Sequence, residues 1–182
     1  MKYSHRIVAP ISLILLFVFV SGCGGTQPPE EELKLCQQAM EQAKTVQAEK
    51  LAAADWSSAE NKMNDAQFAI KNKRYGDAKT FYLQAKSRYE KAYTVGKSKH
   101  DQYMREVDEE RTAIGTNSAK LKALAAKAPA KKKKDIEANL SEIDQHIAEL
   151  DKAVAEKDAV KSKLTSKEVQ EMIYKASRSL EP

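Results

Sequence analysis

The sequence has little of what most enzymes and metal-binding proteins require. Its 182 residues include two cysteines, three histidines and six glycines. Cys36 has no CxxC partner, and His100 and His146 lie far apart. There is no HExxH motif, no GxSxG motif and no glycine-rich phosphate loop. We therefore predict that the protein is not an enzyme and has no catalytic residues, no metal site and no cofactor.

The N-terminal apolar run is too short to cross a membrane permanently. It covers residues 7–20, which is 14 residues, and it contains Pro10, whereas a membrane-spanning helix needs about 20 apolar residues. Lys2 and Arg6 precede the run, and small residues follow it. A charged start, a short apolar stretch and small residues before a cleavage site indicate a secretory signal peptide.

The end of this segment, Val20-Ser21-Gly22-Cys23, resembles the lipobox of bacterial lipoproteins. The resemblance implies that residues 1–22 are removed, that the Cys23 thiol receives a diacylglyceryl group, and that the new amino group is acylated, for example with palmitate. Two or three acyl chains hold a protein firmly to a bilayer, at ~0.8 kcal/mol per buried methylene. The alternative is an ordinary signal peptide or an uncleaved anchor, in which Cys23 is incidental.

The residue after Cys23 bears on location. In enteric bacteria an Asp at this position resembles a signal for retention in the inner membrane, but Gly24 stands there in this chain. We therefore expect a lipid-anchored protein of the cell envelope, in the outer membrane and facing the periplasm.

The charge of the mature chain does not indicate nucleic acid as a partner. Removal of residues 1–22 takes away Lys2 and Arg6 and leaves 29 basic against 26 acidic residues. This balance differs from the strongly basic surfaces that bind nucleic acid.

The mature chain is rich in Ala, Lys, Glu and Gln, which are strong helix formers, and the predicted fold class is all-α. Residues 23–30 are expected to be a lipidated, flexible tether. Residues 31–128 are predicted to form a long antiparallel hairpin of two helices, 31–72 and 75–127, joined by a turn at 72–74.

Both helices of this hairpin carry apolar residues at a spacing of three and four, which places them on one stripe. In the second helix large and small residues alternate, so two such stripes can interdigitate. Glu110 and Asn117 interrupt the second stripe, and residues 115–118 predict a kink or a break. The stripes are Trp56, Ala59, Met63, Ala66 and Ile70 in the first helix, and Tyr75, Ala78, Tyr82, Ala85, Tyr89, Ala92 and Gly96 in the second.

The C-terminal part, residues 129–180, is predicted to contain a basic loop and two further helices. Pro129 ends the preceding helix, and residues 129–134 form the loop. Thr165 and Glu168 fit a capping box that begins a short last helix, ending near residue 178. The longer helix before it carries a coiled-coil-like stripe of Ile136, Leu140, Ile143, Ile147, Leu150 and Val154.

Residues 53–93 carry a family resemblance. They include Ala-Ala-Asp-Trp-Ser-Ser-Ala-Glu-Asn-Lys-Met and then Ala-Ile-Lys-Asn-Lys-Arg-Tyr-Gly-Asp-Ala-Lys-Thr-Phe-Tyr-Leu-Gln-Ala. The second part resembles the turn between the helices of a tetratricopeptide repeat, with its packing positions at Tyr75, Ala78, Tyr82 and Ala85. No proline ends the helix and no second copy follows, so a solenoid is not expected.

The same residues, together with the lipobox, resemble an uncharacterised helical family of envelope lipoproteins, domain of unknown function 4398. Its members pair a lipobox with a Trp/Ala-rich helix, a turn and a Tyr-x-x-Ala helix. The resemblance implies a location and a fold, and no known chemistry.

Three aromatic residues and one cysteine have two interpretations each. Trp56 is either a packing residue or a ligand platform. Phe81 and Tyr82 form either part of the core or an exposed edge that contacts a partner protein. Cys36 is either a small apolar residue on a helix or half of an intermolecular disulfide.

The basic tract is the strongest functional lead in the sequence. The simpler interpretation of this tract is a solvated loop, in which lysines also suit the negative end of the preceding helix. If the first helix rises by about 60 Å and the second descends by about 80 Å, the loop returns near the lipid anchor. There its lysines would contact anionic headgroups, each contributing ~1 kcal/mol. The tract is Lys131, Lys132, Lys133 and Lys134, preceded by Lys120, Lys122 and Lys127.

Two function classes follow. The first is a non-enzymatic adaptor, spacer or scaffold, held to the membrane by its lipid and acting through helical contacts with an envelope protein or with a second copy. The second is a peptidoglycan- or ligand-binding lipoprotein that uses the tyrosine edge or the lysine tract.

Overall fold

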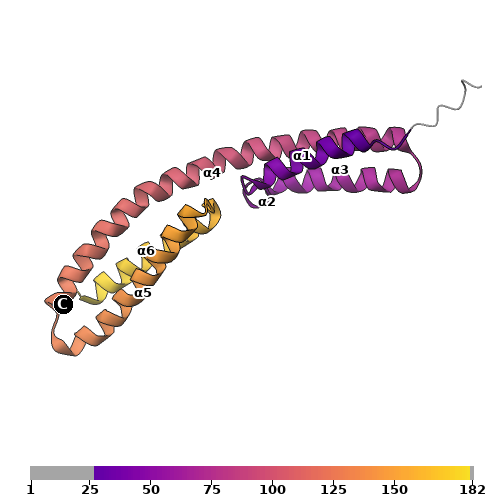
Figure 1. Cartoon of the computed structure of the whole chain (residues 1–182). Helices are drawn as coiled ribbons and strands as arrows, with labels where there is room; N and C mark the ends of the chain where they lie inside the picture. The colour runs from indigo at the N-terminus through magenta and orange to yellow at the C-terminus, as the bar shows by residue number, and fades with distance from the viewer. Residues whose placement is uncertain (1–26, 181–182) are drawn as a thin grey trace, which may run out of the picture.

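The computed structural model describes residues 27–180, and this part of the chain is helical throughout, apart from short turns. The expected all-α fold class is confirmed. The predicted signal peptide and lipobox lie outside the described residues. The elements are α1 (Glu30–Lys44), α2 (Ala48–Leu51), α3 (Ala53–Lys71), α4 (Tyr75–Ala126), α5 (Ala130–Ala155) and α6 (Ala159–Leu180) (Figure 1).

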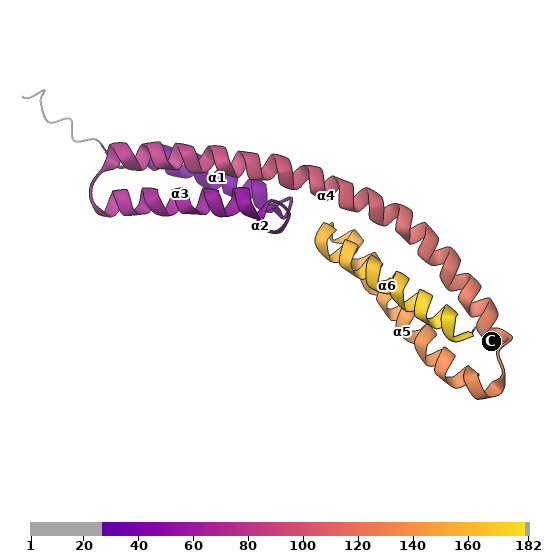
Figure 2. The ribbon, with the colours of Figure 1, turned by 180° about the vertical axis from the view of Figure 1, so that it is seen from behind.

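Helix α4 is the spine of the molecule. Its 52 residues correspond to a length of about 78 Å. It follows a gentle arc, and the other helices lie along its concave side in two groups (Figures 1 and 2). The N-terminal bundle consists of α1–α3 and the first half of α4, and the C-terminal bundle consists of α5, α6 and the second half of α4.

The two alternating stripes form the core of the N-terminal bundle, as predicted. Tyr82 and Tyr89 are buried, and the rings of Trp56 and Tyr89 meet edge to face with their centroids 5.1 Å apart. Small residues of α1 and α3 fill the space opposite these rings: Cys36, Ala39, Ala59 and Ala66. Large rings on one helix therefore face small side chains on two others.

The core of the C-terminal bundle uses the predicted stripe of α5. Ile143 and Leu150 are fully buried against Val107 and Leu121 of α4 and Val169 of α6. Ile136 is buried as well, so the expected third helix is confirmed.

The prediction of one helix over residues 31–72 is wrong, because the chain reverses direction between residues 45 and 52. Helix α1 runs parallel to α4, since Glu32 pairs with Lys79, 2.6 Å away. Helix α3 runs antiparallel to α4, since Asp55 pairs with Lys91, 2.7 Å away. The stripes on the two sides of the bend have the same spacing, but Ala43 and Trp56 are 13 residues apart, which in one continuous helix would place them about 220° apart around the axis.

The predicted break near Gly115 is also wrong. Helix α4 continues through residues 115–118 without interruption. A Cβ at Gly115 would meet nothing within 4 Å, and the Thr116 hydroxyl donates to the Thr112 carbonyl at 3.0 Å. The glycine lies in an ordinary helical turn, where its absent side chain costs helix propensity but does not break the helix.

Two boundaries in the C-terminal part differ from expectation. Helix α5 begins at Ala130, directly after Pro129, so the predicted basic loop is the first turn of a helix. Helix α6 begins at Ala159 rather than near Thr165, which is buried inside it. The carboxylate of Asp158 caps this helix by accepting from the Lys161 N–H at 2.9 Å.

Candidate interaction surfaces

The described residues present no metal-binding cluster. They contain no group of three or more His, Cys, Asp and Glu side chains that could hold a metal ion. No described helix is long and apolar enough to span a bilayer. Three surfaces of the described chain stand out, at the two ends and in the middle of α4.

The end of the molecule opposite the start of α1, here called the far end, is basic. It is formed by the α4–α5 turn, the start of α5 and the end of α6 (Figure 1). From Arg111 to Lys134 the chain holds eight basic residues and no Asp or Glu. Lys132 donates to the Ser179 carbonyl at 3.3 Å, which ties the start of α5 to the end of α6.

A groove of about 410 Å³ runs between α4 and α6 near this basic end. Its floor consists of the buried side chains of Ile114, Leu121 and Ile173. Leu124 and Tyr174 form part of its walls, with 51% and 60% of their surface exposed. These are two of the six large apolar residues that lie exposed on the described surface, and the groove brings them together.

A polar cluster fastens α6 to α4 on the side of this groove nearer the centre. The Lys163 ammonium lies 2.8 Å from a Glu106 oxygen and 2.5 Å from Glu110, and the Ser166 hydroxyl donates to the other Glu110 oxygen at 2.5 Å. Hydrogen bonding to Glu106 raises the pKa of Lys163, and the same contact lowers the pKa of Glu106. Glu110 interrupts the apolar stripe in the sequence, and in the structure it joins α4 to α6 through Lys163 and Ser166.

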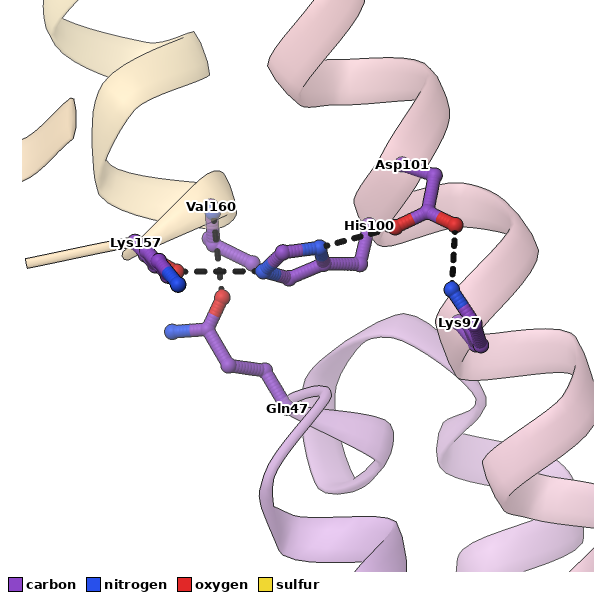
Figure 3. A network of polar contacts seen from close by, with 6 residues as sticks. All are labelled: Gln47, Lys97, His100, Asp101, Lys157 and Val160. Carbon is purple, nitrogen blue, oxygen red and sulfur yellow. Dashed lines mark hydrogen bonds and ion pairs between the residues drawn. The ribbon is translucent and has the colours of Figure 1, made fainter.

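The two bundles meet at a polar junction in the middle of α4 (Figure 3). The side-chain amide of Gln47 donates to Asp158 at 2.7 Å, and its oxygen accepts from the Val160 N–H at 3.3 Å. From α4, the His100 ring lies 3.1 Å from the Lys157 carbonyl. These contacts join the α1–α2 corner to the α5–α6 turn, so the two bundles contact each other directly as well as sharing α4.

The near end of the molecule holds the first described residues. The start of α1 lies beside the α3–α4 turn in both views, at the opposite end of α4 from the basic tract (Figures 1 and 2). The predicted lipidation residue, Cys23, and the predicted lipobox residues Val20, Ser21 and Gly22 lie outside the described residues.

The predicted return of the lysine tract to the anchor is contradicted by this arrangement. The reversal at residues 45–52 brings the start of α1 to the α3–α4 turn, so the tract lies about 78 Å away along α4. Lys132, Lys133 and Lys134 are exposed, and Lys133 lies 4.0 Å from Glu137. The side chain of Lys131 lies outside the described set.

The predicted aromatic contact surface is wrong for Tyr82. This ring is 4% exposed and belongs to the N-terminal core, because it occupies the stripe that faces α1 and α3. Phe81 is half-buried beneath the Lys62 ammonium, which lies 5.1 Å from the ring centroid. Sequence reasoning missed Leu124 and Tyr174, because their neighbourhood depends on how α6 packs on α4.

Trp56 and Cys36 take the simpler of their two interpretations. Trp56 packs against Tyr89 in the core. Cys36 is fully buried, and its burial raises the pKa of the thiol to about 11. A neutral, enclosed thiol does not support an intermolecular disulfide.

The fold and these surfaces define a class: an elongated, all-helical protein in which one continuous helix carries two small bundles. Within it, residues 31–106 match the family model described as a domain of unknown function (DUF4398). The match covers the N-terminal bundle and supports the resemblance found in the sequence, while α5, α6 and the groove lie beyond it. No curated protein and no solved structure matches the chain.

Proposed function

We propose that this protein is a lipid-anchored spacer of the bacterial cell envelope. Cys23 fixes the near end to the membrane, and α4 carries the basic far end away from it, where it contacts a partner protein. The observation that supports this most directly is the position of the first described residues, which lie at one end of a continuous helix about 78 Å long.

The length of the tether adds a geometric constraint. Seven residues run from Cys23 to Pro29, and whatever their conformation they span at most about 25 Å. Acylation of Cys23 would therefore keep the α3–α4 turn close to the bilayer. The far end is free of this constraint, because the length of α4 exceeds that of the tether about threefold.

Exposed helical surface supports a role in protein contact rather than catalysis. Leu124, Leu164 and Tyr174 on the C-terminal bundle are all more than half exposed. The tyrosine edge of the alternative, ligand-binding function lies inside the core at Tyr82 and Tyr89. The lysine tract is the feature through which a cell-wall polymer could still be bound.

The test uses native protein purified from membranes and reconstituted in vesicles that carry spin-labelled headgroups. Intact mass should show a chain that begins at Cys23 and bears acyl groups, and a Cys23→Ser variant should lack them. A fluorophore on an introduced cysteine at Asn72 should be quenched, whereas one at Lys127 should not, because quenching is short-ranged. Buried Cys36 should stay unlabelled.

Two outcomes would contradict the proposal. A native chain that begins elsewhere, or carries no acyl mass, removes the anchor. Equal quenching at Asn72 and Lys127 in acylated protein would mean that the rod lies along the membrane, with its lysine tract on the headgroups.

A further inference from the structure

The groove between α4 and α6 has the shape of a helix-binding site. Its lining residues on α4 run from Ile114 to Leu124, and those on α6 run from Gln170 to Ser177. Ten residues of helix rise by about 15 Å, so the groove extends over roughly three turns. An incoming helix of about 10 to 12 residues would cover it.

The position of the groove in the bundle also suits a helix. Helix α6 packs extensively against both α4 and α5, and no residue of α5 lines the groove. The groove therefore lies on the face of the α4–α6 pair that α5 leaves uncovered. A helix laid there would complete a four-helix arrangement, with its apolar side chains between Leu124 and Tyr174.

The charge around the groove indicates the sign of the charge that a partner should carry. Lys120 lines it, and Lys127 follows Leu124 by three residues on the same side of α4. Among the described residues, neither of these two lysines forms an ion pair within 4.0 Å, in contrast to Lys122, which pairs with Asp144 at 2.8 Å. Unpaired cations at the rim of an apolar groove favour a partner that carries carboxylates and reject one that carries cations.

From these observations we propose that the α4–α6 groove binds an acidic amphipathic helix of a partner protein. Two or three apolar side chains, spaced three and four apart, enter the groove between Leu124 and Tyr174. Asp and Glu residues on the flanks of that helix face the lysines. The binding mode is that of a helix in a groove. The proposal rests on the proposed function only for the place where the partner is met.

A first experiment identifies the occupant in cells that make the full chain. A photo-crosslinking phenylalanine analogue replaces Leu124 or Tyr174, and Phe68, which is 62% exposed on the N-terminal bundle, is the matched control site. The crosslinked peptides are sequenced by mass spectrometry. Positions 124 and 174 should capture one acidic segment with helical apolar spacing, and position 68 should not capture it.

Three results would overturn the proposal. They are capture of a segment that is basic or lacks the apolar spacing, capture only of a second copy of this chain, and capture only of lipid or cell-wall glycan. Absence of any capture at 124 and 174 above the level at position 68 would do so too.

A second experiment tests the chemistry with a defined probe. The probe is a capped, helical 14-residue peptide with Leu at positions 3, 7 and 10 and Glu on both flanks, and its control has Lys in place of each Glu. Purified full-length protein in neutral phosphatidylcholine vesicles should bind the Glu peptide and not the Lys peptide. Binding should weaken as salt is raised, because the rim charges are exposed.

Two variants locate this binding. The double change Lys120→Glu and Lys127→Glu should weaken it by about tenfold or more, while Lys71→Glu on the other bundle should leave it unchanged. Leu124→Ala should weaken it with unchanged helix content. Equal binding of both peptides, or no binding of either, contradicts the proposal.

Peptide binding does not depend on acylation. Failure to bind the Glu peptide would therefore leave the spacer proposal intact, and absence of the acyl groups would leave the groove proposal intact.

Discussion

At the scale of single residues, small side chains decide how closely the helices approach. The N-terminal core has alanine or glycine at most of its contact positions, including Ala59, Ala66 and Ala85, and all three are fully buried. The closest approach is at Gly96, where an added Cβ would lie 3.1 Å from the Cα of Ala48 and 3.2 Å from a methyl carbon of Val46. The corner that reverses the chain is thus built directly against a glycine.

The substitution Gly96→Ala should therefore destabilise the protein. The gain in helix propensity is about 1 kcal/mol, but overpacking costs about 1 to 3 kcal/mol, and the backbone atom of Ala48 has little room to move. We expect a net loss of about 1 kcal/mol in the free energy of unfolding, measured by urea denaturation. Gly115→Ala is the matched control, with open space around it, and should stabilise by about 0.5 to 1 kcal/mol. A stabilising Gly96→Ala would mean that the corner does not pack on α4.

At the scale of elements, two helix ends use lysine where glycine is usual. At the end of α3, the Arg74 N–H donates to the Ala69 carbonyl and the Lys73 N–H to the Ile70 carbonyl, both at 2.9 Å. This is a Schellman motif, and Lys73 takes the left-handed conformation with φ of 57°. Lys157, with φ of 56°, repeats the arrangement at the end of α5.

Lys73→Gly should stabilise the protein, because glycine adopts the left-handed conformation without the steric cost that a Cβ brings. We expect a gain of about 0.5 to 1 kcal/mol in thermal or urea unfolding. The same change inside a helix should have the opposite sign. Lys99→Gly, at an exposed position of α4, should lose about 1 kcal/mol. If both changes destabilise, the α3–α4 turn does not end in a Schellman motif.

At the scale of the whole molecule, the continuity of α4 determines how long the molecule is. The stripe defects at Glu110 and Asn117 do not break the helix. Glu110 bonds to Lys163 and Ser166 of α6, and Asn117 lines the groove. The junction at Gln47 and His100 then holds the two bundles along one curved axis (Figure 3).

Single-molecule energy transfer between dyes at Asn72 and Lys127 should report a separation of somewhat less than about 78 Å, because α4 is curved. Gly115→Pro should shorten the mean distance, since proline removes a hydrogen bond and kinks a helix interior at ~3 kcal/mol. Gly76→Pro, in the first turn of α4, should leave the distance unchanged, because the N–H groups there have no partner within the helix. Equal distances in all three proteins would show that α4 is not the rigid spine.

The sequence by itself determined the local structure. The spacing of Tyr, Ala, Ile and Leu identified α4 and α5 and much of the core along them, because each helix must turn one apolar stripe inward. The buried corner residues Val46, Ala48 and Leu51 lay on no predicted stripe. The turn at residues 72–74 was predictable as well, since the apolar pattern stops there. The predicted secretory signal rests on residues that precede the described ones, and it stays a prediction from the sequence.

Only the tertiary structure decided which parts of the chain lie together. The reversal at residues 45–52 depends on Gln47 in a left-handed conformation and on the fit against Gly96, and no glycine or proline marks this bend in the sequence. Because of that one bend, the start of α1 lies at the α3–α4 turn, at the opposite end of α4 from the lysine tract. The groove likewise exists only where α6 meets α4, because side chains separated by about 50 residues in the chain form it.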